Sequence, residues 1–483
     1  KKLINELKNH KPNFEKDAEQ YEEKLLYFLF TTANILPSYA FPLRMCEFPI
    51  QDTKGKEIEC PTQRLDAAIV EYAPGRFLTV NGENYTIVGL AAKKVGNNRA
   101  EYLFENKKTY SYCHDCDNTS NETMDKCANC KSENIEKLSV IAPSVVYGRN
   151  RDDGEEDQYS GASNAELLIQ DLDEDKFEQY SDNSNKITLE DQDLLKINLG
   201  PNKEGYQICE KCGVDNQNDN GNKETPYIMH GGRRGRCEHS FSKVNLGFEY
   251  KSDVFLLRTK LAPEIKIDEK NIYQIAAFNY AAQTLSEAII QASAKIQDID
   301  PREIGAGHKI RQEDNAVDIY ICDNSSGGAG YALQIAPFIQ RHFIDGKKYL
   351  ERNCCEISCY LCLQNFGNRH HHKKIDKKYG LALLAYIEEN ILPDQYNEKK
   401  QHEFAFTIIK LLELDGALVQ PNNGRLIFTK DGVDLNVYIY PAFYNTNYIK
   451  GKFPDNGVWV SDFEATKSPT TAYEQIIQKL NKN

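Results

Sequence analysis

Three groups of closely spaced cysteines are the residues of this 483-residue chain that are best suited to chemistry. In the first group, Cys113-x2-Cys116 and Cys127-x2-Cys130 are separated by ten residues. Two such pairs can deliver four thiolates to one tetrahedral Zn²⁺ ion. Four protein ligands leave no coordination position open for water, so we expect a structural zinc ribbon rather than a catalytic metal.

The second group is built on Cys209-x2-Cys212, followed by Cys237 and two histidines. Three cysteines and one histidine would complete a second tetrahedral zinc site. His230 is the favoured fourth ligand, because Cys237-x-His239 would place two ligands on one short turn. The alternative, His239, stays open at this point.

The third group places Cys354, Cys355, Cys359 and Cys362 within nine residues. Adjacent cysteines do not easily bind the same ion, so a nearby histidine or Cys322 could supply the fourth ligand. Repeated Cys-x2-Cys pairs without a secretory signal favour zinc in a reducing compartment over disulfides. We therefore predict two to three Zn²⁺ ions per chain and a cytoplasmic location.

Several elements can position these groups. Residues 18–31 have helical periodicity, and residues 76–90 read as a β-hairpin around Asn81-Gly82. Residues 271–296 predict a long amphipathic helix that ends before Asp300-Pro301. Residues 244–258 predict two strands, and residues 316–322 predict one buried strand. A glycine-rich turn follows that last strand and contains Asp323, Gly327, Gly328 and Gly330. The turn lacks the Lys-Ser/Thr of a Walker A loop, so its glycines are expected to allow a sharp turn or close backbone approach.

The C-terminal segment predicts a separate α+β unit. Helices are expected at 403–413 and 469–481, and strands near 417–420, 424–429 and 434–440. Acids and a lysine in this segment suggest a metal-dependent nuclease as an alternative: Asp434, Asp462, Glu464 and Lys467. The Glu-x-Lys spacing of restriction-type nucleases is absent, however, so a structural or docking unit is the default interpretation.

The formal net charge of −13 argues against general nucleic-acid binding only if it is evenly spread. Residues 151–200 hold fifteen acids and four bases, which leaves about −2 for the rest of the chain. Residues 341–378 carry nine Lys/Arg and four acids. Candidate phosphate contacts in and around this basic stretch are Arg341, Lys347, Lys348, Arg369, His372, Lys373 and Lys374.

We therefore predict a multidomain α+β protein that is stabilised by zinc, with a small zinc ribbon and an α/β zinc-binding domain. No run of eighteen apolar residues occurs, so no membrane partner is expected. The predicted units are an N-terminal helix and hairpin region, the ribbon, an acidic and partly mobile insertion, the zinc-binding domain and the C-terminal unit, at residues 1–110, 111–135, 136–205, 206–380 and 381–483.

Several unusual strings occur in a fixed order: LPSYAFP (36–42), RLDAAIVEYAPG (64–75), CEKCG (209–213), LGFEYKSDVFLLR (246–258), DNSSGGAGY (323–331) and CYLCLQNFGNRHHHKKIDK (359–377). In this order, the chain resembles the zinc-binding domain found at the C-terminus of MrfA-type helicases and in DrmB, over roughly residues 30–380. Cys355, Cys359 and Cys362 match the family's cysteine cluster, whereas Cys354 stands one place from its usual first cysteine. The spacing of His230 and Cys237 also matches the family.

The resemblance implies a non-catalytic module that works with a superfamily 2 helicase and binds DNA. In the DISARM anti-phage system, DrmB is paired with the helicase DrmA, so a DrmA-like partner and a role in recognising foreign DNA are expected. No Walker A motif occurs in this chain, which fits an accessory subunit and fits equally a helicase whose motor half lies outside this chain. The alternative is the C-terminal accessory half of a single-chain MrfA-like helicase for repair or defence.

Overall fold

The computed structural model describes residues 45–51, 57–94, 97–114, 118–127, 132–150, 163–167, 174–216, 237, 239–325, 327–365, 367–422, 425–453 and 457–481. The predicted helix at 18–31 lies outside these residues, as do Cys116, Cys130 and His230. Within them, no helix combines the length and apolar character that crossing a membrane requires.

The N-terminal part is built on a six-stranded sheet in the order β4-β1-β11-β6-β5, with β7 paired to β6. Helix α3 (Leu65–Glu71) buries Ile69 and its neighbours against this sheet. A short pair, β2 and β3, and helix α4 (Glu101–Glu105) complete it. The strands are β1 (Met45–Glu47), β2 (Ile50–Gln51), β3 (Glu57–Glu59), β4 (Thr62–Arg64), β5 (Phe77–Val80), β6 (Glu83–Lys94), β7 (Asn97–Arg99) and β11 (Val145–Asn150).

The central part contains a ten-stranded sheet whose main path is β12-β14-β16-β10-β8-β9. The sheet is organised around the 20-residue strand β16 (Phe241–Lys260), which pairs with β10, β14, β15 and β18. The other strands are β8 (Lys108–Cys113), β9 (Thr119–Ser120), β10 (Ile135–Ile141), β12 (Ser163–Leu167), β13 (Glu178–Gln179), β14 (Ser184–Asn198), β15 (Tyr206–Cys209), β17 (Ile304–Arg311) and β18 (Ala316–Asp323).

Three helices, α5 (Ile272–Gln297), α6 (Ile339–Leu350) and α7 (Lys377–Glu389), pack together beside strands β17 and β18. Helix α5 is mostly buried and begins at Asn271, whose side chain accepts hydrogen bonds from two backbone amides of the first turn. The largest hydrophobic core joins these helices to the sheet and includes Cys362 and Leu363. The third cysteine group is therefore anchored in this core.

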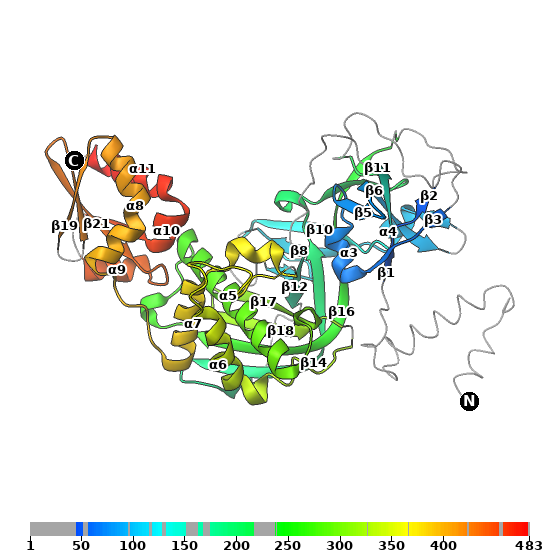
Figure 1. The fold of residues 1–483 in the computed structure, drawn as a ribbon, viewed down its shortest axis with the longest axis horizontal. Helices are drawn as coiled ribbons and strands as arrows, with labels where there is room; N and C mark the ends of the chain where they lie inside the picture. Colours follow the sequence, from blue (N-terminus) through cyan, green and yellow to red (C-terminus); the bar gives the residue numbers. More distant parts are fainter. Residues whose placement is uncertain are drawn as a thin grey trace.

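The C-terminal part has a four-stranded sheet in the order β19-β20-β21-β22, with β22 parallel to β21. Its elements are α8 (Glu398–Leu414), β19 (Leu418–Asn422), β20 (Arg425–Lys430), β21 (Val433–Tyr440), α9 (Thr446–Lys452), β22 (Val458–Ser461), α10 (Asp462–Lys467) and α11 (Pro469–Leu480). Figure 1 shows this part and the N-terminal part on opposite sides of the central one. Lys378 of α7 pairs with the buried Asp462 of α10, which ties the C-terminal part to the central helices.

The α+β class is confirmed, and several predicted elements lie where expected. The hairpin of β5 and β6 turns at Asn81 and Gly82, which both have positive φ, as a two-residue type I′ turn requires. The predicted helix at 271–296 is α5, and the predicted strand at 316–322 is β18. The C-terminal unit also contains α9, β22 and α10, which the sequence did not predict.

Two predictions need correction. The acidic, partly mobile insertion predicted at 136–205 includes residues 184–198, and these residues form β14, which pairs along most of β16. Its apolar residues, including Leu194 and Leu195, are buried, whereas the acidic residues lie near an irregularity in the pairing between Leu189 and Gln192. Residues 244–258, predicted as two strands, form part of the single strand β16.

Candidate metal centres

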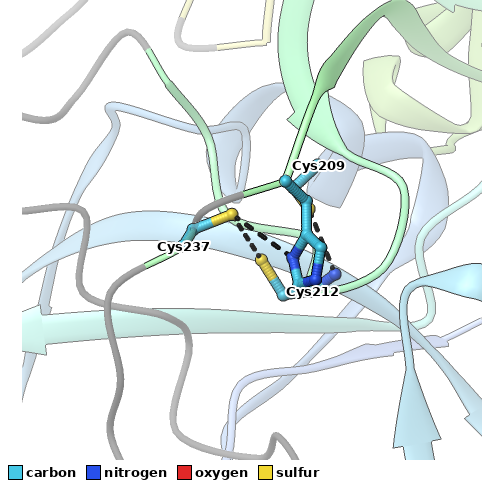
Figure 2. Close-up of side chains that lie close together, drawn as sticks. Cys209, Cys212 and Cys237 are labelled. Carbon is cyan, nitrogen blue, oxygen red and sulfur yellow. Dashed lines mark hydrogen bonds between the residues drawn. The ribbon is translucent and has the colours of Figure 1, made fainter.

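The first candidate centre, here called the knuckle site, consists of Cys209, Cys212, Cys237 and His239. Their ligand atoms all lie within 4.8 Å of one another. Cys212 Sγ lies 3.3 Å from Cys237 Sγ, and Cys237 Sγ lies 3.8 Å from His239 Nδ1. Figure 2 shows the three cysteine side chains gathered in one place. This donor set suits a tetrahedral zinc ion.

The backbone of the knuckle is fixed by strand β15 and by Gly213. Cys209 ends β15, which pairs with β16, and the Cys212 amide donates to Cys209 Sγ at 3.4 Å. Gly213 has φ of 72°, and a Cβ there would lie 1.9 Å from the carbonyl oxygen of Leu90. Only glycine allows this close approach, which holds the knuckle against the N-terminal sheet.

The electrostatics of the knuckle favour a metal-binding thiolate at Cys209. A hydrogen bond from the Cys212 side chain lowers the pKa of the Cys209 thiol, against the opposing effect of burial. The deprotonated sulfur is the form that binds zinc. The fully buried Cys209 is thus poised to bind a cation rather than to serve as an ordinary core thiol.

The fourth ligand of the knuckle site is the point on which the sequence prediction and the structure can be compared. The structure brings His239 to the knuckle site, whereas the favoured His230 lies outside the described residues. We expect His239→Ala to lose one Zn²⁺ ion per chain in a competing chelator, because a tetrahedral site with three ligands is weakened. His230→Ala, the matched control, should keep its full zinc content by mass spectrometry. The reverse result would place His230 in the site instead.

The second candidate centre, here called the tetracysteine site, consists of Cys354, Cys355, Cys359 and Cys362, just after α6. All four sulfurs lie within 4.8 Å of one another. The sulfurs of Cys354 and Cys359 lie 3.5 Å apart, and those of Cys355 and Cys362 lie 3.7 Å apart. Both adjacent cysteines therefore reach the same point. The sequence analysis expected a histidine or Cys322 to replace one of the adjacent cysteines as a ligand. This geometry needs no such replacement, because all four cysteines can bind one ion.

The alternative ligands for this site have other partners. Cys322 is buried in β18, where its sulfur lies 3.7 Å from the Tyr250 hydroxyl. His372 Nε2 lies 3.0 Å from both the Asn365 carbonyl and Asn368 Oδ1. Neither side chain joins the four sulfurs, so the tetracysteine site is supplied by its own short segment.

The surroundings of the tetracysteine site hold its loop in place. A hydrogen bond from the backbone amide of Leu361 lowers the pKa of the Cys359 thiol. The buried Lys377 donates from Nζ to the carbonyls of Arg352 and Cys355, at 2.7 and 2.6 Å. Sequence reasoning missed this role for Lys377, because the residue stands in a run of lysines and nothing local marks it as the buried one.

The predicted ribbon is described only in part. Cys113 and Cys127 are buried side by side, and the Asn118 side-chain amide donates to Cys127 Sγ at 3.6 Å. Strand β8, which ends at Cys113, pairs with β10. Cys116 and Cys130 lie outside the described residues, so the four-thiolate ribbon stays a prediction.

The glycine-rich turn has a structural explanation. The fully buried Asp323 carboxylate accepts hydrogen bonds from the backbone amides of Ala329, Tyr331 and Ala332, at 2.5, 3.1 and 2.8 Å. Gly327, Gly328 and Gly330 all have positive φ. Asp323 thus organises the turn from inside through these three hydrogen bonds.

The candidate phosphate contacts lie on two elements. Arg341, Lys347 and Lys348 belong to α6, and Arg369 and His372–Lys374 belong to a 3-10 helix at Arg369–Lys374. Lys373, Lys374, Arg341 and Lys348 are exposed, which is what contact with phosphates requires. Arg369 differs, because its guanidinium lies 3.5 Å from Glu71 of α3.

The acids that suggested a nuclease do not converge. Asp434 accepts from Thr429 on the neighbouring strand, and Asp462 is buried against Lys378. Burial raises the pKa of Glu464 to about 7, and its carboxylate accepts from Gln475. In the described part of the chain, the knuckle and tetracysteine sites are the only groups of three or more ligands close enough to share an ion.

Comparison with known families gives the class of this site. The model of the MrfA Zn-binding domain matches residues 285–363, from within α5 to just past Cys362. This match and the two clustered donor sets establish zinc as the cofactor that these residues hold. Residues 285–363 are therefore similar to the MrfA Zn-binding domain.

A particular relative is Druantia protein DruE of Escherichia coli (strain UMEA 4076-1), which is 29% identical over 433 residues. The match covers 82% of this chain and 23% of DruE, so the chain spans about a quarter of the length of that relative. Among solved structures, DUF1998 helicase MrfA bound to DNA has a TM-score of 0.35 at 12% identity, over 71% of this chain and 33% of that one. MrfA without DNA has a TM-score of 0.29 at 9% identity, over 68% and 33%.

Proposed function

We propose that this chain is a zinc-stabilised, non-catalytic DNA-binding module of an anti-phage defence system and works together with a superfamily 2 helicase. The observation that carries the proposal is the tetracysteine site inside the segment that matches the MrfA Zn-binding domain. Four protein ligands leave no open coordination position, so the zinc there organises structure rather than activating water. Similarity to Druantia protein DruE supports the defence context.

Two arrangements fit this role. In the first, which is DISARM-like, the chain is a DrmB-like subunit that pairs with a separate DrmA-like helicase. In the second, it is the C-terminal accessory part of a longer helicase polypeptide. The DruE match favours the second, because it spans 82% of this chain and only 23% of DruE. Sequencing upstream of Lys1 decides between them, since a Walker A motif in the same reading frame supports the longer polypeptide.

DNA binding can be tested through its salt dependence. Affinity that rests on phosphate contacts falls steeply as salt rises, because each contact releases condensed counterions. We expect Lys348→Ala/Lys374→Ala to weaken binding at 50 mM salt and to reduce the slope of log K against log salt by about one per lysine, measured by fluorescence anisotropy. Lys399→Ala/Lys410→Ala on α8 is the matched control for exposed lysines.

The control pair should leave both the affinity and the slope unchanged. If the chain binds neither single-stranded nor duplex DNA in a salt-dependent way, alone or with its helicase, the proposed function is wrong. Equal losses in the two variant pairs would instead show that the α6 region has no special role.

A further inference from the structure

A cavity of about 440 Å³ lies between the N-terminal part and the central helices, and no cysteine of either metal centre lines it. Its walls come from α3, from α5, from the turn after β18 and from the segment that follows Cys362. The volume falls within the range of small-ligand sites, which bury one molecule among a few placed polar groups. None of the groups that line it has a role in the proposed zinc or DNA-backbone contacts except Arg369.

The buried carboxylate of Glu287 is the most unusual group that lines this cavity. It projects from the middle of α5, is only 5% exposed, and lines the cavity. Its two carboxylate oxygens accept hydrogen bonds from Gln283 Nε2 at 3.0 Å and from Asn368 Nδ2 at 2.8 Å. Burial raises the pKa of Glu287 to about 7. Within the described residues, no lysine, arginine or histidine forms an ion pair with it.

A buried carboxylate that has only amide donors around it is costly for the folded state. Two hydrogen bonds use about half of the acceptor sites that a carboxylate offers. The remaining sites can receive N–H donors of a ligand, and a buried group of this kind in a cleft marks a candidate binding site.

Asn368 is held in place by the segment that carries the tetracysteine site. Its Nδ2 also donates to the carbonyl of Leu363, the residue after Cys362, at 2.8 Å. Its Oδ1 accepts from the Asn365 amide at 2.8 Å. The amide group therefore has a fixed orientation, and it fixes Glu287 in turn. Further side-chain amides of Gln63, Asn324 and Asn365 also line the cavity.

The rim of the cavity carries cations. Arg64 pairs with Asp66 at 3.3 Å, and Lys196 lies 4.0 Å from Asp66, which is a loose contact. Arg302 pairs with Asp300 and is 74% exposed. Exposed or loose ion pairs of this kind contribute little to the free energy of folding. A bound anion can therefore replace Asp66 or Asp300 as the partner of these cations with little loss of stability. The lining thus combines the buried acceptor Glu287 with the cations Arg64, Lys196, Arg302 and Arg369, and it also carries the acids Asp66, Glu71 and Glu303.

We propose that this cavity binds one guanine nucleotide, with the base edge on Glu287 and the phosphate near Arg64, Lys196 and Arg302. Guanine presents two adjacent N–H donors, at N1 and at the exocyclic N2, and a carboxylate can accept both. Other bases offer no such pair of donors on one edge. Enzymes and binding proteins read an unstacked base through hydrogen bonds to this edge. The nucleotide comes either free or as an unpaired residue of a DNA strand, and the second source rests on the proposed function.

The test uses the full chain and calorimetric titration with dGMP, dAMP, dCMP and TMP. We expect dGMP to bind at least tenfold more tightly than the others, and Glu287→Gln to lose at least tenfold of that affinity. Glu464→Gln is the matched control, because burial raises the pKa of Glu464 to about 7 as well, but in the C-terminal part. It should leave dGMP binding unchanged.

A second variant keeps the test decisive if Glu287→Gln does not fold. Arg302→Ala alters an exposed side chain and should weaken dGMP binding several-fold while the preference for guanine is retained. The nine-nucleotide strands dT9 and dT4-dG-dT4 separate the two sources. Tighter binding of the guanine strand that is lost in Glu287→Gln, and overall weaker binding of that strand in Arg302→Ala, assign the site to DNA, whereas binding of dGMP alone assigns it to a free nucleotide.

Equal or absent binding of all four nucleotides, together with equal binding of the two strands, would overturn the proposal. That result would leave salt-dependent DNA binding through Lys348 and Lys374 untouched, so the two failures are distinguishable. Conversely, dGMP selectivity in a chain that binds no DNA would support the guanine site and contradict the proposed function.

Discussion

Replacing Cys362 with serine is expected to remove one Zn²⁺ ion per chain and to unfold the central helices around the tetracysteine site. Cys362 is buried, its sulfur lies 3.7 Å from Cys355 Sγ, and the next residue, Leu363, is part of the largest core. Structural zinc binding contributes about 10–16 kcal/mol in small zinc domains. That is comparable with the whole stability of a domain, about 5–15 kcal/mol.

Zinc content by mass spectrometry and hydrogen exchange over residues 272–389 measure this effect. Cys60→Ser is the matched control, because Cys60 is a half-buried thiol outside both candidate centres. It should keep its zinc and its exchange protection. A Cys362→Ser chain that retains full zinc in a competing chelator, with native protection of α5 and α7, would show that the tetracysteine site holds no structural ion.

The candidate metal centres were largely predictable because their cysteines are close in sequence. Cys354 to Cys362 lie on one short segment, so any compact fold brings them together. The sequence could not settle the histidine of the knuckle site, since that choice depends on the path of the chain between Cys212 and Cys237. Nor could it show that both Cys354 and Cys355 reach one point, which depends on the local backbone.

The cavity was not predictable in the same way. Glu287 and Asn368 are 81 positions apart, and in sequence Glu287 looks like an ordinary polar residue on an Ala-rich helix. Its surroundings depend on the packing of α5 against the segment after Cys362, which brings Asn368 to its carboxylate, and no local pattern encodes this contact. Strand β14 could not be predicted either, because its burial also depends on residues far away in the sequence. Its acidic composition suggested a solvated segment, whereas its pairing with β16 buries the apolar residues on one face.

The pair of Arg258 and Asp318 gives the second large effect. They lie opposite each other on β16 and β18, with side chains only 3% and 5% exposed. The guanidinium donates to both carboxylate oxygens, at 2.8 and 2.9 Å, and also lies 4.9 Å from the centre of the Phe177 ring. Asp318→Ala leaves a buried arginine without its carboxylate, which costs about 3–5 kcal/mol.

Urea unfolding followed by circular dichroism measures this loss, and two variants show its cause. Asp314→Ala removes the half-exposed partner of Arg311 and should cost about 1 kcal/mol or less, because exposed ion pairs are weak. Arg258→Met/Asp318→Leu replaces both charges with apolar groups and should recover most of the stability, since the desolvation of the two ions is then avoided. If Asp318→Ala is no more harmful than Asp314→Ala, the buried pair does not hold β16 and β18 together, and the apolar contacts of these strands suffice.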